Sequence, residues 1–236
     1  MAKIPPYALP DASDLPRNRV DWRVDPDRAV LLVHDMQNYF VDAYTPGDGP
    51  LDVVIPQIDA LRRAANAEGV PVVFSAQPPD QHPDDRGLLN DFWGAGPGAG
   101  PGARPQDTAV IDALQPGAED HVLTKWRYSA FQRTDLRERM RAQGRDQLII
   151  TGIYAHIGCL MTACEAFMQD IQAFFVADAT ADFSLEDHRM ALRWAAERCA
   201  VTTRTDAVLE QLRVPAGVRR SGRDALGTRP TVSPAR

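Results

Sequence analysis

Three short apolar runs of this sequence end next to residues that could do chemistry. The run Ala-Val-Leu-Leu-Val-His ends at Asp35, and two further runs end at Lys125 and at Gly152. A short apolar run closed by a turn signal is typical of a buried parallel strand, and ligands bind beyond the carboxyl ends of such strands. We therefore expect a carboxyl group, an ammonium group and a glycine turn to meet in one pocket, as proton transfer and anion binding require.

The elements that must position these residues alternate along the chain. Apolar residues at three- and four-residue spacing predict helices over 51–65 and 160–171, and Ser184 with Asp187 resembles a capping box that opens another helix. Strand-like runs separate the helical segments, at 28–34, 70–75, 121–124, 147–151, 173–177 and 200–203. This alternation predicts an α/β fold of three layers, with a central, mostly parallel six-stranded sheet between helices.

Composition favours one globular domain, which we place at residues 1–212. The chain has 236 residues, of which 44 % are hydrophobic. Residues 213–236 contain six arginines and one acidic residue, so we predict a disordered basic tail there. The other residues carry a net charge of −11, from 20 basic and 31 acidic side chains, which argues against a nucleic-acid partner. The Gly/Pro-rich segment 94–105 cannot hold a helix, and we interpret it as a flexible loop, either a lid or a linker.

Cysteine usage and the lack of long apolar segments indicate the compartment. Cys159, Cys164 and Cys199 are odd in number and contain no CxxC pair, which is typical of reduced thiols rather than of a disulfide framework. The N-terminal segment has no signal-peptide pattern, and no run approaches the roughly 18 apolar residues of a membrane span. We expect a cytoplasmic protein with no membrane partner.

Five ordered segments resemble the isochorismatase-like hydrolases, over about residues 4–212. The resemblance implies a Rossmann-related sheet, an enzyme that uses no cofactor, a small-molecule substrate and a homodimer. The matching segments are His-Asp-Met-Gln-Asn-Tyr-Phe at 34–40, Ser-Ala-Gln at 75–77, Arg-Gly-Leu-Leu-Asn-Asp-Phe-Trp-Gly at 86–94, Lys-Trp-Arg-Tyr-Ser-Ala-Phe at 125–131 and Thr-Gly-Ile-Tyr-Ala-His-Ile-Gly at 151–158.

The sequence departs from most of this family at the nucleophile. Most members cleave amides with an Asp-Lys-Cys triad, in which the cysteine lies six residues after the glycine of a Thr-Gly pair. Six residues after Gly152 lies Gly158, and Cys159 would be turned by about 100° on a helix. A glycine here is similar to the branch that hydrolyses a vinyl ether, namely the siderophore-pathway isochorismatases and the phenazine-pathway enzyme that acts on 2-amino-2-deoxyisochorismate.

The resemblance assigns three residues to the reaction. Asp35 would be the general acid that protonates the methylene carbon of the enolpyruvyl group, and Lys125 would act with it. Gly158 would occupy the position at which most of the family carries the nucleophilic cysteine. An aspartic acid must keep its proton near neutral pH, so we expect burial to raise the pKa of Asp35 from about 3.9. A nearby Lys125 would lower this pKa unless it pairs with a substrate carboxylate.

The resemblance also implies the groups that bind the substrate. Gln77 and Arg86 would be polar contacts, and the Arg86 fork suits a carboxylate. The peptide bond between Ile153 and Tyr154 would be cis, and the amides that open a helix at about Gly158 would face the pocket. Aromatic walls would come from Phe40, Trp93, Tyr128 and Tyr154.

Several histidines and acids near these motifs have other interpretations. Asp80 and His82 look like a metal pair, but they lie three positions later than the metal ligands of some relatives, so we expect no metal. His34 and His156 flank the pocket motifs, and we interpret both as hydrogen-bonded structural histidines.

Two other functions remain open at the level of sequence. The protein could be a cysteine hydrolase of a small amide, using Asp35, Lys125 and Cys159, or a non-catalytic partner protein that has kept the pocket. If the protein hydrolyses a vinyl ether, the segment after Leu212 bears on the substrate. Many siderophore-pathway isochorismatases carry an aryl carrier domain after the hydrolase, and this segment is too short and polar for one. This moderately favours the 2-amino substrate and trans-2,3-dihydro-3-hydroxyanthranilate over isochorismate and 2,3-dihydro-2,3-dihydroxybenzoate.

Overall fold

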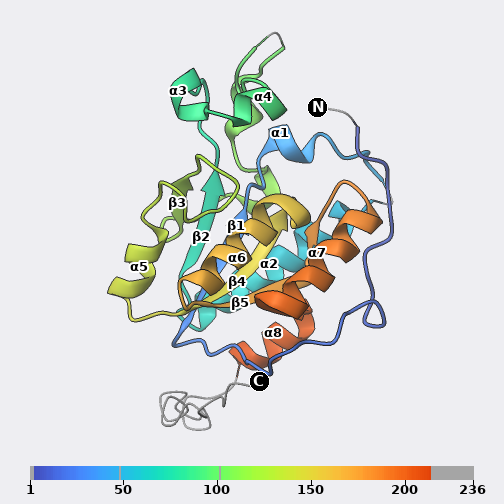
Figure 1. Cartoon of the computed structure of the whole chain (residues 1–236), viewed down its shortest axis with the longest axis vertical. Helices are drawn as coiled ribbons and strands as arrows, with labels where there is room; N and C mark the ends of the chain where they lie inside the picture. Colours follow the sequence, from blue (N-terminus) through green and yellow to red (C-terminus); the bar gives the residue numbers. More distant parts are fainter. Residues whose placement is uncertain (1–2, 48, 101, 214–236) are drawn as a thin grey trace, which may run out of the picture.

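A six-stranded parallel sheet forms the centre of the protein (Figure 1). The computed structural model describes residues 3–47, 49–100 and 102–213. The strand order is β3-β2-β1-β4-β5-β6, and every neighbouring pair is parallel, which confirms the predicted fold class. The strands are β1 (Ala29–His34), β2 (Val72–Ala76), β3 (His121–Thr124), β4 (Gln147–Ile153), β5 (Gln172–Ala181) and β6 (Ala200–Thr203).

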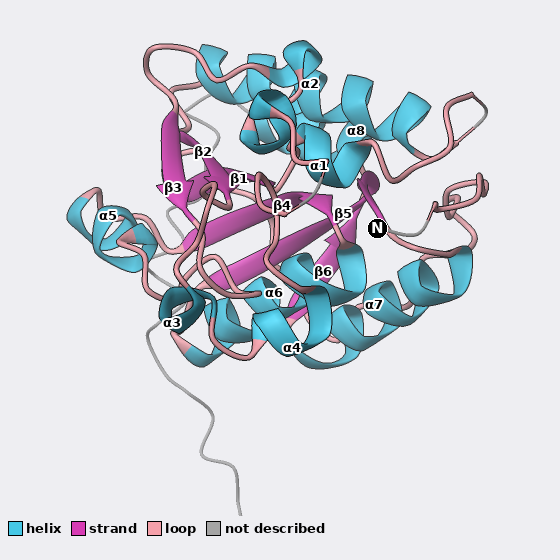
Figure 2. Cartoon of the chain, turned by 90° about the horizontal axis from the view of Figure 1, so that it is seen from above, coloured by secondary structure: helices cyan, strands magenta, loops and turns pink. Residues whose placement is uncertain are grey.

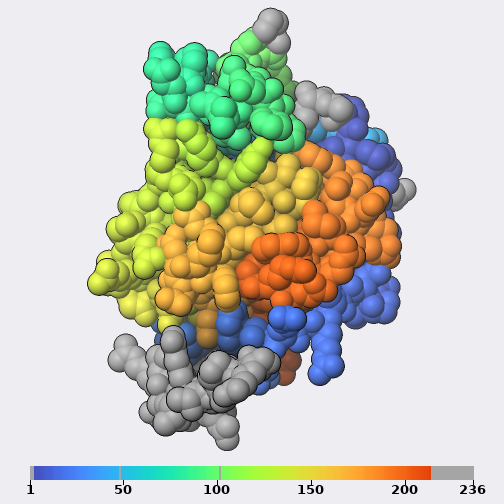
Figure 3. Space-filling model, viewed as in Figure 1, coloured from blue at the N-terminus to red at the C-terminus, as the bar shows by residue number. Residues whose placement is uncertain are grey.

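Helices cover both faces of this sheet (Figure 2). One face carries α1 (Asn38–Val41), α2 (Leu51–Ala67) and α8 (Thr205–Leu212), and the other carries α5 (Leu136–Ala142), α6 (Leu160–Met168) and α7 (Leu185–Arg198). Two short helices, α3 (Pro83–Arg86) and α4 (Leu89–Trp93), form a raised segment at one end of the molecule (Figure 3, green). Single turns complete the elements: η1 (Pro105–Thr108), η2 (Asp112–Leu114) and the π-helical turn η3 (Ala155–Cys159).

The chain order of the strands places a switch point between β1 and β4. Strands β1 to β3 run outward on one side of this point, and β4 to β6 run outward on the other. Ligands bind at such a point because the loops that follow the two central strands diverge to opposite faces and leave a crevice. Strand β1 is buried on both faces, with Leu31 and Val33 in the core on the α2 side and Val30 and Leu32 in the core on the α6 side.

Two strands are longer than their sequence patterns predicted. Strand β4 continues to Ile153 instead of ending at residue 151, and β5 continues to Ala181 instead of ending at residue 177. The extension of β5 begins with Asp178, which interrupts the apolar run. The Asp178 carboxylate is nevertheless satisfied inside the protein, because it accepts hydrogen bonds from the backbone N–H and the hydroxyl of Thr205.

The remaining predictions about organisation have different outcomes. The basic tail lies outside the described residues, apart from Arg213. In the segment 94–105, the described residues up to Arg104 contain no helix, as the composition predicted, but the last residue, Pro105, begins η1. The chain is held at the start of this segment, where the Arg86 side chain donates to the carbonyl of Gly94 (2.8 Å). Within the described ranges, no helix is both long and apolar enough to cross a membrane.

Candidate active site

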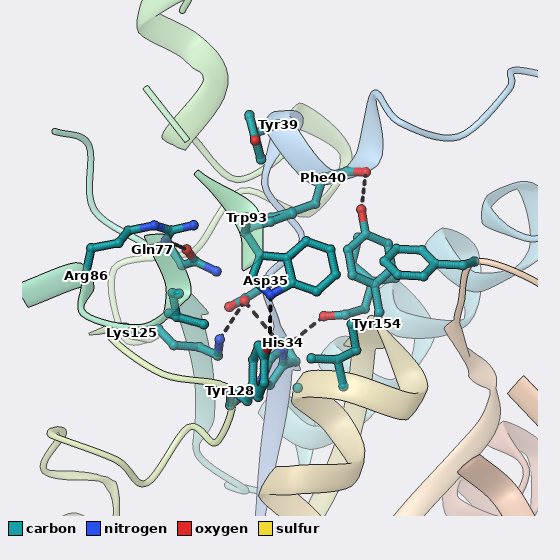
Figure 4. A pocket seen from close by; sticks show the side chains of 15 residues that line it. His34, Asp35, Tyr39, Phe40, Gln77, Arg86, Trp93, Lys125, Tyr128 and Tyr154 are labelled. Atoms are coloured by element: carbon teal, nitrogen blue, oxygen red, sulfur yellow. Dashed lines mark hydrogen bonds and ion pairs between the residues drawn. The ribbon is translucent and has the colours of Figure 1, made fainter. Parts of the chain in front are cut away.

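A pocket lies beyond the carboxyl ends of β1, β2, β3 and β4 (Figure 4). Its empty space is about 550 Å³, a figure that includes the open mouth. All nine residues assigned from the sequence line it together: Asp35, Phe40, Gln77, Arg86, Trp93, Lys125, Tyr128, Tyr154 and Gly158.

A buried ion pair lies at the base of this pocket. Asp35 directly follows β1 with a left-handed backbone (φ +48°), and Lys125 directly follows β3. The ammonium nitrogen of Lys125 lies 2.9 Å from Oδ2 of Asp35, and the two residues are only 2 % and 5 % exposed. The hydroxyl of Ser75, on β2, donates to Oδ1 of Asp35 (2.6 Å). The Asp35 carboxylate, at the end of β1, is therefore held by one residue on β2 and by one residue that directly follows β3.

The expected raised pKa of Asp35 is wrong for the unliganded protein. Burial does raise the pKa of this carboxyl group, but the charge and hydrogen bond of Lys125, the electrostatic interaction with His34 and the hydrogen bond from Ser75 together outweigh burial. The pKa of Asp35 is therefore held below its ordinary value, and the group is a carboxylate at neutral pH. Lys125 forms its ion pair with Asp35 itself. Asp35 can therefore bind a proton, and later donate it, only after Lys125 has exchanged Asp35 for another partner.

A guanidinium group without an acidic partner lies on the other side of the pocket. Arg86 ends α3 and is 4 % exposed. Its Nη1 donates to the side-chain oxygen of Gln77 (2.9 Å) and its Nε donates to Gly94 O. In the part of the chain that the structure describes, no carboxylate forms an ion pair with Arg86. Because a buried cation is unfavourable without a counter-charge, this group is suited to bind an anion from outside.

Gln77 is held in place by a second glutamine. The side chain of Gln37 accepts a hydrogen bond from the Gln77 backbone N–H (2.8 Å) and donates to the carbonyls of Gln77 (2.9 Å) and Thr108 (2.7 Å). Gln37 is fully buried. It therefore ties the loop after β1 to the loop after β2 and fixes the residue that contacts Arg86.

Aromatic rings form the walls between these polar groups (Figure 4). The indole N–H of Trp93 donates to the hydroxyl of Tyr128 (2.7 Å), which closes one side of the pocket. The hydroxyl of Tyr154 donates to the carbonyl of Phe40 (3.1 Å), and burial raises the pKa of Tyr154, so this phenol stays neutral. The ring of Phe183 packs against Tyr154 with centroids 4.4 Å apart. Flat apolar walls with a few fixed polar groups suit a planar or cyclic ligand that carries carboxylates.

The turn after β4 differs in part from the expectation. The peptide bond between Ile153 and Tyr154 is cis, as the resemblance implied. The helical turn begins at Ala155, however, so Gly158 lies inside η3 rather than at the start of a helix. The amide of His156 donates to the Asp182 carboxylate, and those of Ile157 and Cys159 donate to the carbonyl of Tyr154. These three amides are therefore already hydrogen bonded within the protein.

The other candidate groups lie away from the pocket lining. Cys159 is fully buried in the core between the sheet and α6, where burial raises the pKa of its thiol. His156 pairs with Asp182 (2.6 Å). Among the described residues, no three His, Cys, Asp or Glu side chains gather as metal ligands would, and the side chain of His82 is largely exposed.

Sequence reasoning assigned no role to several residues that build this site. Ser75 and Gln37 hold Asp35 and Gln77, and both lie inside the motifs that carried the resemblance, so their position was the available signal. Other residues on the lining are His34, Tyr39, Leu89, Ile153, Ile157 and Phe183. Phe183 precedes the N-cap of α7 and no pattern in the sequence links it to the pocket.

Comparisons with known proteins agree with this geometry. The family model described as "Isochorismatase domain" matches residues 29–207. "Isochorismatase" from Bacillus subtilis (strain 168) is 59 % identical over 219 residues, which are 92 % of this chain and 69 % of that protein. "Phenazine biosynthesis protein PhzD" from Pseudomonas fluorescens is 51 % identical over 206 residues, 87 % of this chain and 97 % of that protein. A solved structure of a cysteine hydrolase from Pseudomonas syringae pv. phaseolicola 1448A has a TM-score of 0.73 at 25 % identity, covering 84 % of this chain and 97 % of that one. The chain belongs to the isochorismatase family.

Proposed function

We propose that this enzyme hydrolyses the enolpyruvyl vinyl ether of isochorismate or of 2-amino-2-deoxyisochorismate, in siderophore or phenazine-type biosynthesis. The products are pyruvate and a trans-dihydro cyclohexadiene, either 2,3-dihydro-2,3-dihydroxybenzoate or trans-2,3-dihydro-3-hydroxyanthranilate. Relatives of 59 % and 51 % identity are named for isochorismatase activity and for phenazine biosynthesis, which supports this pair of substrates.

One observation carries the proposal: the pocket contains a buried acid–cation pair and a buried, unpaired guanidinium, but no nucleophilic side chain at position 158. The Lys125–Asp35 pair is neutral overall, so Arg86 gives the pocket a net positive charge that attracts a carboxylate. A vinyl ether needs a proton donor and a water molecule, and it needs no covalent intermediate with the protein. The pocket thus supplies what this reaction uses and lacks what amide cleavage through a thiol requires.

The reaction begins with a transfer of a proton to carbon. We propose that a substrate carboxylate pairs with Lys125 in place of Asp35. The effect of burial on the pKa of Asp35 then prevails, and Asp35 binds a proton. Asp35 gives this proton to the methylene carbon, while an electron pair of the ether oxygen forms the oxocarbenium ion. Water adds to the cationic carbon and returns a proton to Asp35. In the hemiketal, the bond between the central carbon and the ether oxygen attached to the cyclohexadiene ring then breaks. This oxygen takes up the proton of the hemiketal hydroxyl and leaves as the ring alcohol, and the remaining fragment is pyruvate.

The experiment that tests this function is a pyruvate assay coupled to lactate dehydrogenase. Isochorismate, 2-amino-2-deoxyisochorismate and chorismate are supplied separately. Fast release from one of the first two supports the proposal and identifies the substrate. No release from any of them would refute it and would leave the non-catalytic alternative.

We also propose that the enzyme is a cytoplasmic homodimer. The three cysteines are free thiols, which fits a reducing compartment. Large apolar side chains at the end of α6, Phe167 and Met168, are 49 % and 73 % exposed, as residues of a subunit interface would be in an isolated chain. Light scattering on the purified protein measures the mass, and a monomer at all concentrations would contradict the dimer.

A further inference from the structure

The imidazole of His34 occupies the space into which any side chain at position 158 would extend. A Cβ atom on residue 158 would lie 2.1 Å from Cε1, 2.7 Å from Nε2 and 3.0 Å from Nδ1 of His34. Real Cβ atoms essentially never approach other heavy atoms more closely than 3.0 Å. A side chain at position 158 and the ring of His34 in its present position therefore exclude each other.

The ring of His34 lies between two backbone carbonyls and is buried. Nδ1 lies 2.9 Å from the carbonyl oxygen of Ile153, at the end of β4, and Nε2 lies 3.3 Å from the carbonyl oxygen of Tyr128, in the loop after β3. The side chain is 1 % exposed. A neutral imidazole carries one N–H, and this N–H donates to one of the two carbonyls. The ring thus lies between the end of β4 and the loop after β3, and it is hydrogen bonded to one of them.

The same ring lies next to the acid. Its Nδ1 is 3.8 Å from Oδ2 of Asp35, the oxygen that also meets Lys125. Both His34 and Gly158 line the pocket with Asp35 and Lys125, so a thiol or hydroxyl at position 158 would face the same substrate. An acid–base pair beside such a group would activate it as a nucleophile.

We propose that His34 is a positioning residue that also decides which chemistry the pocket performs. Its imidazole takes the volume of a nucleophilic side chain at position 158, packs between the end of β4 and the loop after β3 beside Asp35, and restricts the site to hydrolysis without a covalent intermediate. This inference deepens the proposed function and rests on it for the role of Asp35. The exclusion between His34 and position 158 stands on geometry alone.

A double-mutant cycle on thermal unfolding tests the exclusion. Gly158→Ala is expected to lower Tm by about 5 °C in the wild-type background, because an overpacked methyl group displaces the ring. In a His34→Ala background the methyl group has room, so the same substitution is expected to change Tm by less than about 2 °C. Equal losses of Tm in both backgrounds would overturn the proposal.

Gly152 provides the matched control. A Cβ atom at position 152 would lie 2.2 Å from the backbone oxygen and 2.6 Å from the backbone nitrogen of His34. Removing the imidazole cannot relieve a contact with the backbone. Gly152→Ala is therefore expected to destabilise the protein by the same amount with and without His34→Ala.

Alkylation tests the consequence for chemistry. In the His34→Ala/Gly158→Cys variant, the new thiol is expected to react with iodoacetamide at least tenfold faster than the buried Cys159, as mapped by tandem mass spectrometry. A thiol at position 158 that stays as inert as Cys159 in this variant would show that the ring is not what excludes a nucleophile.

Kinetics separate positioning from a merely structural role. In His34→Ala we expect kcat for pyruvate release to fall at least tenfold while KM changes less than threefold, because Arg86 and Gln77 do not contact the ring. His34→Asn, which keeps a donor toward Ile153, is expected to recover part of kcat. A rise in KM with kcat unchanged would contradict positioning of Asp35. If the wild-type enzyme releases no pyruvate, the proposed function fails, but the Tm cycle and the alkylation still decide the role of His34.

Discussion

At the level of single residues, the site combines two cations that have different partners. Lys125 is neutralised by Asp35, and among the described residues Arg86 is hydrogen bonded to neutral oxygens only. Because of this difference, we expect the two cations to bind substrate carboxylates in different ways. Arg86 can accept a substrate carboxylate without losing an ion pair, whereas Lys125 can do so only by giving up Asp35. In the proposed mechanism, this exchange allows Asp35 to bind a proton.

The first prediction concerns Arg86. Arg86→Lys keeps the charge but loses the fork that donates to Gln77 and Gly94, so we expect KM to rise at least tenfold while kcat changes less. Steady-state rates of pyruvate release measure both constants. Arg133→Lys is the matched control, because Arg133 is exposed and pairs with Asp85 outside the pocket. The assignment of Arg86 would be wrong if both variants kept the wild-type KM.

At the level of elements, sequence patterns predicted what depends on local periodicity and chemistry. The strand β3, the strand β6 and the N-cap at Ser184 are where the sequence placed them. The carboxyl ends of β1 and β3 also placed Asp35 and Lys125 together, as expected. Gly152, which was expected to form a turn at the pocket, instead lies inside β4 and is absent from the pocket lining. The resemblance then supplied Gln77 and Arg86, which no periodicity could identify as parts of the same pocket.

What escaped prediction depends on contacts between distant residues. The last residues of β5 lack an apolar pattern. They form a strand because Thr180 and Ala181 pair with the end of β4, and Thr205 satisfies the buried Asp178 carboxylate. At the start of the turn η3, the His156 amide donates a hydrogen bond to the carboxylate of Asp182, which lies 26 residues further along the chain. The pKa of Asp35 followed from the 2.9 Å approach of Lys125 and from Ser75, both on other strands. Such approaches are set by tertiary packing and leave no local signal.

A second prediction belongs to α7. The Ser184 hydroxyl accepts a hydrogen bond from the backbone N–H of Asp187 (3.1 Å), and the preceding residue, Phe183, lines the pocket. Ser184→Ala is expected to lower stability by about 1 kcal/mol, or Tm by about 2–4 °C. Ser184→Thr keeps the accepting oxygen and should lose less. Calorimetry of both variants decides this, and equal losses would mean that the cap is not responsible.

At the level of the whole molecule, burial of histidine links stability to pH. His188, on α7, is fully buried, with Nδ1 3.3 Å from the hydroxyl of Tyr7 and Nε2 3.1 Å from that of Thr180. Burial lowers the pKa of His188 from 6.5 to about 4. Between these two values the unfolded chain binds a proton that the folded protein does not bind, so stability is complete above pH 6.5 and is lost as the pH falls toward 4.

The third prediction follows from this difference in proton binding. His188 accounts for about 3 kcal/mol of the loss of unfolding free energy between pH 6.5 and pH 4. His188→Gln removes the titrating group, so its stability should fall less steeply over this range in urea unfolding experiments. His82→Gln, at a histidine whose side chain is 69 % exposed, is the control and should behave as the wild type does. Parallel curves for all three proteins would contradict the assignment to His188.

The most direct test of the account is hydrolysis of the preferred substrate in deuterium oxide by the wild-type enzyme and by Asp35→Asn. Lactate dehydrogenase traps the pyruvate as lactate, and mass spectrometry counts the deuterium in the methyl group. We expect one deuterium per methyl group from the wild type, and a rate at least a hundredfold lower from Asp35→Asn, because protonation of carbon by Asp35 starts the reaction. A wild-type rate in Asp35→Asn, or a methyl group without solvent deuterium, would contradict the proposed mechanism.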